Sequence, residues 1–340
     1  MDQEQFQRKK QWAGDLIPSM KRRRVGHDYQ SRCIYMITLV VEGRRPLFGH
    51  VTGDGDREPA VMHPSPLGKA VLDQLAAITS HYPTATVISQ QLMPDHLHFI
   101  IFVKDRIPCH LSRVINGYKG GCTRLYRQYL QDPSQPILWE RGYNDRILTG
   151  KNHLQRMMDY LDDNPRRLAI KRHKPDYFQV QQGINLAGHT FAALGNLFLL
   201  QAPQLLQVQC TRRLTQQEIA DTCRRFMDQA ANGAVLVSPS ISPGEKAVMR
   251  AAFEHGYPII ILQENGFAPL AKPGGKRFDA CSEGRLLLLA PWEHHNDRRV
   301  IKRSQCWQLN DMAAAICNPT PDNPAAAGAA PHLNPAPAVR

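Results

Sequence analysis

The chain contains the run Pro94-Asp95-His96-Leu97-His98-Phe99-Ile100-Ile101, in which a polar turn passes into an apolar strand. Side chains alternate between the two faces of a strand, so His96 and His98 are expected on one face and Leu97 and Phe99 on the other. Two neighbouring imidazoles supply two ligands for a divalent metal ion. The alternative is a pair of half-buried histidines with no ligand, and only a third ligand decides between the two.

A helix predicted over residues 152–164 offers that third ligand. Tyr160 and Asn164 are four residues apart, which places both on one face of the helix, one turn from each other. If the helix lies across the strand, the Asn164 amide oxygen binds the metal beside both histidines, and the Tyr160 phenol lies near the same ion. Tyrosines on helices also occur simply as core or surface residues, and that alternative stays open.

These residues together resemble a known family of DNA-processing enzymes. His96-Leu97-His98 is similar to the HUH motif, two histidines separated by a hydrophobic residue. Tyr160-Leu161-Asp162-Asp163-Asn164-Pro165 resembles the Tyr-x-x-x-Asn-Pro helix of the REP-associated branch of single-tyrosine HUH transposases. Trp139-Glu140 and residues 145–148 resemble the stretch that precedes this helix in that branch. The resemblance covers about residues 28–172.

The resemblance implies an α+β ferredoxin-like domain, an antiparallel sheet with helices, whose central strand carries the histidines. It also implies a homodimeric transposase that cleaves and rejoins single-stranded DNA with hairpin or palindromic ends. Tyr160 would be the nucleophile that forms a covalent phosphotyrosine, and His96, His98 and Asn164 would hold Mg²⁺ or Mn²⁺. The loop at residues 43–66 is longer than the family pattern, which leaves recognition of the DNA ends open.

Composition agrees with a nucleic-acid partner. The 340 residues carry a net charge of +12 and have a pI near 9.4, and most of the excess falls in the first 180 residues. Lysine and arginine displace the counterions condensed on phosphates, so such a charge favours DNA or RNA before a membrane. The sequence holds no apolar run long enough for a bilayer and shows no secretory signal, so we expect a cytoplasmic protein, nucleoid-associated when bound to DNA.

Two basic segments are candidate DNA contacts. A helix predicted over residues 111–130 interleaves cations, which can follow a phosphate backbone, with rings, which can stack on unpaired bases. The cations are Arg113, Lys119, Arg124 and Arg127, and the rings are Tyr118, Tyr126 and Tyr129. Arg22 and Arg23 belong to a basic arm over residues 1–27. An ordinary solvated basic face is the alternative for both segments.

The second half predicts a different architecture. Short apolar strands near residues 205–209, 234–238, 259–262 and 286–290 alternate with helices, which favours a mostly parallel α/β sheet covered on both faces. This pattern resembles the Rossmann-like superfamily of DNA-processing protein A and the LOG-type nucleotide hydrolases. The expected organisation is a transposase domain at 28–180, a linker at 181–199, a Rossmann-like domain at 200–317 and a disordered Pro/Ala-rich tail at 318–340.

One loop of this second domain is a candidate anion site. Ser242, Gly244 and Lys246 lie where a strand passes into a helix, and free N–H groups at a helix start favour negative charge. A nucleotide is therefore a candidate ligand, although Ser242 is equally able to act only as a helix cap. The other functions left open are a domesticated nickase, a DNA-binding regulator of repeated palindromes, and nucleotide hydrolysis by the second domain.

Overall fold

The computed structural model describes residues 23–24, 26–130, 136–150, 152–268, 270–297 and 299–318. The chain divides into two compact units, Met1–His173 and Lys174–Arg340. Most of the predicted basic arm, with Arg22, and the predicted tail beyond residue 318 lie outside the described residues. Among the described helices, none combines the length and the apolar character needed to cross a bilayer.

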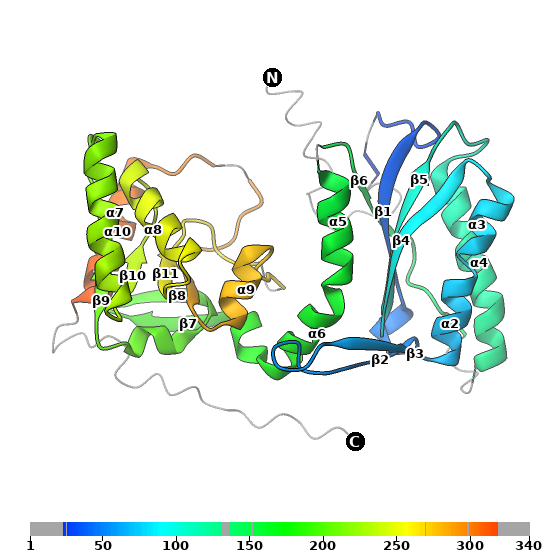
Figure 1. The fold of residues 1–340 in the computed structure, drawn as a ribbon, viewed down its shortest axis with the longest axis horizontal. Coiled ribbons are helices and arrows are strands. Elements are labelled where there is room, and N and C mark those ends of the chain that lie inside the picture. Colours follow the sequence, from blue (N-terminus) through cyan, green and yellow to red (C-terminus); the bar gives the residue numbers. More distant parts are fainter. Residues whose placement is uncertain are drawn as a thin grey trace. The chain divides into compact units, whose positions relative to one another are not determined.

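A four-stranded antiparallel sheet forms the centre of the first unit (Figure 1). Across the sheet the order is β4 (Ala85–Met93), β5 (His96–Val103), β1 (Cys33–Val40) and β6 (Asn144–Ile147). The predicted histidine strand is thus confirmed as β5, and it lies inside the sheet between β4 and β1. Its turn is short because Pro94 and Asp95 alone connect it to β4.

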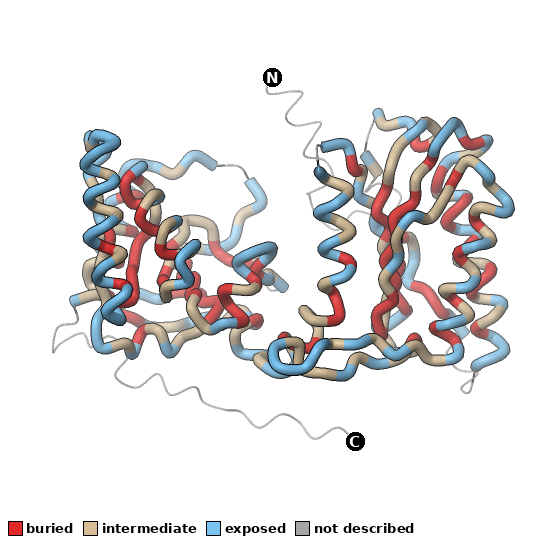
Figure 2. The backbone as a smooth tube through the Cα atoms, in the orientation of Figure 1, coloured by how far each residue is buried: buried red, intermediate tan, exposed pale blue. Residues whose placement is uncertain are grey.

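Different helices cover the two faces of this sheet (Figure 1). Leu97 and Phe99 of β5 point into the main core, which is closed by α2 (Pro66–Asp73), α3 (Ala76–His81) and α4 (Leu111–Tyr129). The opposite face carries the histidines and is covered by α5 (His153–Asp162). Figure 2 shows buried residues concentrated along the strands and on the helix sides that face them.

The helix predicted over residues 152–164 ends at Asp162, and a second helix starts at Asn164, so helical structure continues through Pro165. Asp163 keeps right-handed helical angles (φ −77°, ψ −11°), and its N–H donates to the Asp159 carbonyl. The chain then continues as α6 (Asn164–His173). Pro165 falls in the first turn of α6, where a missing N–H breaks no hydrogen bond. Tyr160 and Asn164 consequently lie on two successive helices.

A hairpin occupies the predicted long loop at residues 43–66. It consists of β2 (Gly49–Thr52) and β3 (Val61–Pro64), and α6 packs against it. Gly49 has φ +132°, and a Cβ there would lie 2.0 Å from the carbonyl oxygen of His63. Only glycine therefore permits the close approach of the two strands at this end of the hairpin.

The second unit is built on a six-stranded mixed sheet that is mostly parallel. The strand order is β7 (Gln181–Leu186), β8 (His189–Gly195), β12 (Leu286–Ala290), β11 (Ile259–Leu262), β10 (Val235–Ser238) and β9 (Leu205–Gln207). The helices are α7 (Gln216–Ala231), α8 (Pro243–Glu254), α9 (Lys276–Ser282) and α10 (Arg303–Cys317). The four strands β9 to β12 are parallel, as the sequence predicted.

The predicted linker over residues 181–199 is wrong. These residues form β7 and β8, which extend the sheet antiparallel to β12, and the second unit begins at Lys174. Buried Phe191 and Ala193 join a core cluster of this unit that also contains Leu287 of β12. The segment reads as a linker because β7 is largely polar and β8 is rich in alanine rather than in β-branched residues.

Candidate metal and nucleophile site

The two histidines of β5 lie together on one face of the sheet, as the alternation predicted. Their ring centroids are 4.7 Å apart, with the planes nearly perpendicular at 84°. His98 is 7% exposed. Their neighbour on this face, Ile100, packs under α5. The strand therefore presents two imidazoles side by side at the edge of a small apolar cluster.

His98 is held from the neighbouring strand. It is the register partner of Thr38 on β1, and the Thr38 Oγ1 lies 2.8 Å from the His98 Nδ1. Burial, and then the nearby His96, lower the pKa of His98 to about 3. His98 is therefore neutral at pH 7, and with Nδ1–H donating to Thr38 its Nε2 keeps a lone pair that can bind a metal.

His96 is held by its own turn. Its Nδ1 lies 2.5 Å from Oδ1 of Asp95, and Oδ2 of Asp95 accepts a hydrogen bond from Arg44 at 3.0 Å. Burial alone would raise the pKa of Asp95, but the His96 hydrogen bond and the Arg44 charge bring it down to about 2. An ionised carboxylate only accepts, so His96 donates Nδ1–H, and in the neutral imidazole the lone pair is on Nε2.

Tyr160 of α5 lies beside this pair. Its ring centroid is 6.3 Å from that of His98, with the planes at 66°, and the residue is 39% exposed. The Arg167 guanidinium on α6 lies 5.7 Å from the centre of the Tyr160 ring. The structure thus brings together a partly exposed phenol, a cation and two imidazoles that are far apart in the sequence.

Asn164 begins α6 and is 8% exposed. Its Nδ2 is buried and has no hydrogen-bond partner among the described residues. A buried amide without a partner costs about 1–3 kcal/mol, so its retention calls for a reason beyond folding. Turning the amide about χ2 exchanges its nitrogen and oxygen, and the oxygen can bind a cation.

The donor atoms fit a divalent metal. No group of three or more His, Cys, Asp or Glu side chains suited to a metal gathers anywhere in the described part of the chain. His96 and His98 therefore lack a third ligand of those types, and the Asn164 amide is the candidate that the sequence offers. Amide oxygen and water suit Mg²⁺ and Mn²⁺, and the imidazoles also accept Mn²⁺ readily.

The predicted base-stacking rings of α4 are largely inaccessible. Tyr118 and Tyr126 are buried in the main core. The Tyr118 hydroxyl donates to the Val71 carbonyl at 2.8 Å, and Arg45 donates to the Tyr126 hydroxyl. Tyr129 is 42% exposed. Tyr118 and Tyr126 are thus core residues. They alternate with cations in the sequence, but they lie on the side of the helix that faces the sheet.

Two of the predicted DNA-binding cations bond within the chain. Lys119 donates from Nζ to the carbonyl oxygens of Glu140 and Gly142, at 2.8 and 2.7 Å. Arg23 forms an ion pair with Asp145 and stacks 3.6 Å above the centre of the Tyr143 ring. Both side chains hold the region around β6, and so they are not free to contact a phosphate in this state.

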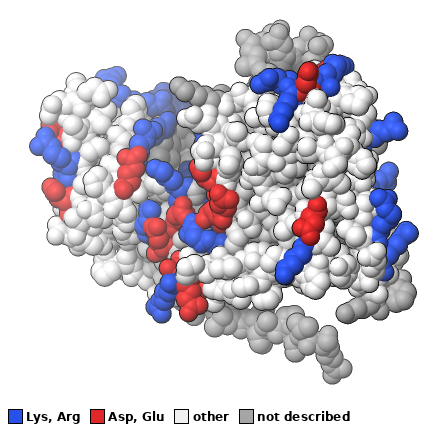
Figure 3. Space-filling view, turned by 45° about the vertical axis from the view of Figure 1, so that its right-hand side comes forward, with Lys and Arg blue, Asp and Glu red and all other residues white. Residues whose placement is uncertain are grey.

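The remaining cations of α4, Arg113, Arg124 and Arg127, are exposed. Their helix covers the face of the sheet opposite the histidines. On the face shown in Figure 3, Lys and Arg occur in separate groups, several beside Asp or Glu, with wide uncharged areas between them. The net charge of the chain therefore does not form one continuous basic surface on that side.

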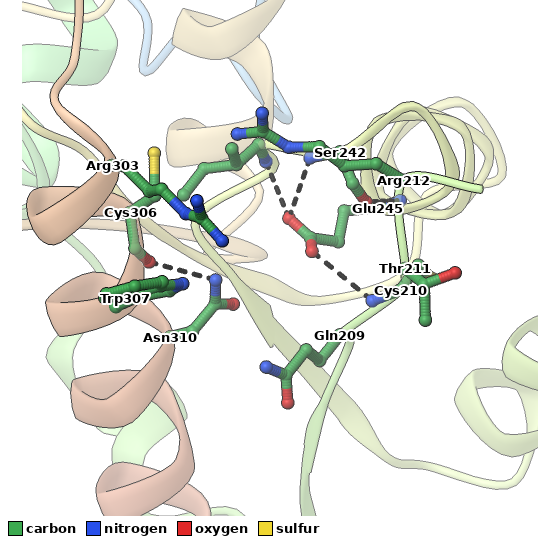
Figure 4. Close-up of a pocket in the computed structure, with 11 residues that line it drawn as sticks. Gln209, Cys210, Thr211, Arg212, Ser242, Glu245, Arg303, Cys306, Trp307 and Asn310 are labelled. Atoms are coloured by element: carbon green, nitrogen blue, oxygen red, sulfur yellow. Dashed lines mark hydrogen bonds between the residues drawn. The ribbon is translucent and has the colours of Figure 1, made fainter. Parts of the chain in front are cut away.

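The predicted anion site of the second unit already contains a carboxylate (Figure 4). Glu245, 2% exposed, accepts hydrogen bonds from the backbone N–H groups of Cys210, Ile241 and Ser242 at 3.3, 2.7 and 3.2 Å. Ser242 caps α8 in return by accepting from the Glu245 N–H. Gly244 packs against Cys210, where a Cβ would lie 2.9 Å from the Cys210 Cβ. The N–H groups of Ile241, Ser242 and Glu245 at this helix start are therefore already engaged.

Two cavities flank α8. The first, of about 300 Å³, adjoins Glu245 and is also lined by Arg212, Arg303 and Trp307. The second, of about 400 Å³, contains the predicted Lys246. Its other cations are Arg250, Lys276 and Arg277, and its lining includes no acidic residue. Lys276 and Arg277 follow Gly274 and Gly275, a local pattern typical of phosphate-binding loops, whereas no local pattern points to Arg250.

Three residues beside the histidines were missed in the sequence. Asp95 directly precedes His96, so its position alone was a usable signal. Thr38 becomes visible only when β1 is paired with β5 in the observed register. Arg44 gives no local signal, because it reaches Asp95 from a turn that follows β1.

Comparison with known proteins shows that residues 29–164 match the family described as Transposase IS200 like. An uncharacterised protein of Haemophilus influenzae is 22% identical over 159 residues, 41% of this chain and 83% of that protein. A solved REP-associated tyrosine transposase bound to a REP hairpin is 13% identical, with a TM-score of 0.31, over 41% of this chain and 70% of the other. DNA processing protein A of Helicobacter pylori, solved in a study of its single-stranded DNA binding, is 18% identical, with a TM-score of 0.31, over 41% and 66%. Both families expected from the sequence are thus among the matches.

Proposed function

Starting from the IS200-like transposase match of residues 29–164, we propose that the first unit is a metal-dependent DNA strand transferase acting through Tyr160. The observation that carries the proposal is the 6.3 Å separation between the rings of Tyr160 and His98. This separation brings the Tyr160 phenol to the His98 imidazole, whose ring lies 4.7 Å from that of His96.

The topology supports the proposal. In chain order the main strands run β1, β4, β5, β6, with helices after the first and third, and their spatial order is β4-β5-β1-β6. This is the connectivity expected of a ferredoxin-like βαββαβ domain. It places the histidine strand inside the sheet, where both neighbours fix its register.

Each residue of the site would have a distinct role in the reaction. Nε2 of His96, Nε2 of His98 and the Asn164 oxygen would hold Mg²⁺ or Mn²⁺, which supplies positive charge to neutralise a phosphate oxygen and orient the phosphorus. Tyr160 gives up its phenolic proton to water, attacks phosphorus and forms the O–P bond of a phosphotyrosine, while the bond to the 3′ oxygen breaks. The 3′ oxygen takes up a proton and leaves as a hydroxyl.

Rejoining is the reverse displacement. A 3′-hydroxyl attacks the phosphotyrosine, the Tyr160–phosphorus bond breaks and the phenol recovers its proton. The energy of the phosphodiester is conserved in the covalent linkage, so no nucleotide is consumed. The Arg167 guanidinium lies 5.7 Å from the centre of the Tyr160 ring and also pairs with Asp163.

The proposed substrate is single-stranded DNA with a hairpin or palindromic end, and the proposed assembly is a cytoplasmic homodimer that associates with the nucleoid through DNA. A phenol that is 39% exposed is reachable by an unpaired strand. The solved relative described as bound to a REP hairpin makes such an end the first substrate to try.

A second activity is proposed for the second unit: contact with a nucleic-acid or nucleotide phosphate. The supporting observation is the cavity lined by Lys246, Arg250, Lys276 and Arg277 without an acidic residue. Since the Glu245 carboxylate already accepts from the N–H groups of Ile241 and Ser242 that precede α8, cationic side chains would supply this contact.

The test of strand transfer uses the full chain, Mn²⁺ and single-stranded DNA from the flanks of its own gene, resolved on a denaturing gel. A covalent protein–DNA adduct is expected, and it should disappear in Tyr160→Phe and with a chelator. Tyr129→Phe is the matched control, because Tyr129 is also exposed but lies on α4. Cleavage without an adduct, or an adduct that persists in Tyr160→Phe, would remove Tyr160 from its role.

A further inference from the structure

We propose that Asp95 and Thr38 are positioning residues of the metal centre, each fixing the Nδ1 of one histidine so that both Nε2 atoms face the ion. This inference rests on the proposed metal-dependent function. It assigns a role to two residues that would not themselves touch the metal or the DNA. It also explains why an ionised carboxylate and a threonine flank the histidine pair.

The His96 half of the arrangement follows from acceptor chemistry. Oδ1 of Asp95 lies 2.5 Å from Nδ1 of His96, and a carboxylate offers no proton. Nδ1 must therefore carry the hydrogen, so in the neutral imidazole the lone pair is on Nε2. A histidine without such a partner exchanges between tautomers, and only one of the two presents Nε2 to a ligand.

Arg44 fixes the carboxylate in turn. Its guanidinium donates to the second oxygen, Oδ2, at 3.0 Å. Arg44 has φ +51°, a left-handed backbone angle that is unfavourable for a residue with a side chain, and it follows Gly43 at φ +65° in the turn after β1. A strained arginine that reaches a carboxylate beside the metal ligands is the kind of outlier that marks a functional site.

The His98 half depends on strand pairing. Thr38 is directly opposite His98 on β1, and its Oγ1 is 2.8 Å from Nδ1. A hydroxyl can donate or accept, so Thr38 admits either tautomer of the free protein. Once Nε2 binds a metal, Nδ1 must carry the hydrogen and Thr38 accepts it. Thr38 is β-branched on a strand, which restricts its χ1 and keeps Oγ1 in place.

Asp95 and Thr38 should contribute to Mn²⁺ affinity to different extents. Asp95 selects the tautomer of His96 before metal arrives, whereas Thr38 only stabilises the form of His98 that metal requires. Partners of this kind contribute about 10–100-fold to metal affinity. We therefore expect Asp95→Ala to weaken Mn²⁺ binding within that range and Thr38→Val to weaken it less.

The first measurement is Mn²⁺ titration of the full chain, following free Mn²⁺ by electron paramagnetic resonance. Asp95→Asn, which keeps an acceptor oxygen but loses the charge, should fall between the wild type and Asp95→Ala. Asp28→Asn is the matched control, because Asp28 also pairs with an arginine, Arg106, but at an exposed position. The control should stay within twofold of the wild type. Unchanged affinity in Asp95→Ala would overturn the proposal.

The second measurement is independent of metal. Nitrogen-15 histidine spectra in chelator should show His96 as the Nδ1–H tautomer in the wild type and a mixture or the other tautomer in Asp95→Ala. If Asp95→Ala does not fold, the nearly isosteric Asp95→Asn is measured in its place. The same tautomer in all three proteins refutes the positioning role. A wild-type chain that shows the expected tautomers but binds no Mn²⁺ refutes the proposed function instead.

Discussion

The ring of Tyr160 lies 6.3 Å from the ring of His98, and the residue that holds it there is its neighbour Leu161. Leu161 is fully buried and packs on Ile100 and Met36, on the histidine face of the sheet. Because Ile100 follows His98 by two residues on one strand, seating Leu161 on Ile100 sets the position of Tyr160 along the strand. Apolar packing therefore determines the geometry of the proposed chemistry.

The unpartnered amide of Asn164 leads to an unusual expectation. Asn164→Leu keeps the approximate volume and removes a buried group that lacks a hydrogen bond, so the metal-free chain should unfold at an equal or higher temperature. Mn²⁺ affinity should fall by about tenfold or more, since an amide ligand is removed. Thermal unfolding in chelator and Mn²⁺ titration measure the two effects.

Leu161→Ala is the contrasting variant, expected to lose about 2–5 kcal/mol through the cavity it creates. If Asn164→Leu were destabilised to a similar extent, the amide would have a structural partner and its assignment as a metal ligand would fail.

The low pKa of His98 predicts a pH dependence of stability in the metal-free chain. The folded pKa is about 3, below the unfolded value of 6.5, so the unfolded chain binds a proton between these values and the folded chain does not. The free energy of unfolding is therefore unaffected by His98 above pH 6.5 and falls as the pH drops below it. The loss should reach about 2 kcal/mol between pH 7.5 and 5.

Urea unfolding in chelator at several pH values measures this loss. His98→Gln should remove that part of the slope, whereas His50→Gln should retain it, because His50 is exposed on the β2–β3 hairpin. Identical slopes in the wild type and His98→Gln would show that His98 titrates normally and is more hydrated than its burial implies.

Much of the site was predictable because its signals are local. The alternation around His96 and His98 is a property of one strand, and Tyr160 and Asn164 are only four residues apart although they lie on the successive helices α5 and α6. What could not be predicted depends on pairing between elements. Thr38 reaches His98 only through the register of β1 with β5, and a shift of one residue would turn it to the other face.

The errors in the fold have a similar origin. The strands β7 and β8 were expected to be a linker because their residues gain stability only from the sheet they join, not from their own propensity. Tyr118 and Tyr126 look like stacking rings in sequence because the same helical period places cations and core residues alternately. The face of α4 that packs on the sheet is determined by tertiary contacts, which cannot be read from the local sequence.

The exposed cations of α4 can be tested for binding to the phosphates of single-stranded DNA. Replacing Arg113, Arg124 and Arg127 with Gln should reduce the slope of log affinity against log salt by about 0.7 for each phosphate that is no longer neutralised. Adduct formation at saturating DNA should not change, because α4 covers the face opposite His98. Salt-dependent binding of a fluorescent oligonucleotide gives the slope, and Arg224→Gln on α7 is the control. An unchanged slope would mean that this face of α4 is only solvated.

Glu245 provides a prediction for the second unit. Its carboxylate accepts from three backbone N–H groups, and Glu245→Ala would leave them without that partner in a buried loop. We expect the free energy of unfolding of this unit to fall by about 3 kcal/mol, and to fall less in Glu245→Gln, which keeps one acceptor oxygen.

Glu218 is the matched control, since it occupies the same capping-box position on α7 but is exposed. Glu218→Ala should cost much less, because water replaces its hydrogen bonds. Equal losses in urea unfolding would show that Glu245 contributes only a helix cap, and the N–H groups beside it would again be open to an external anion.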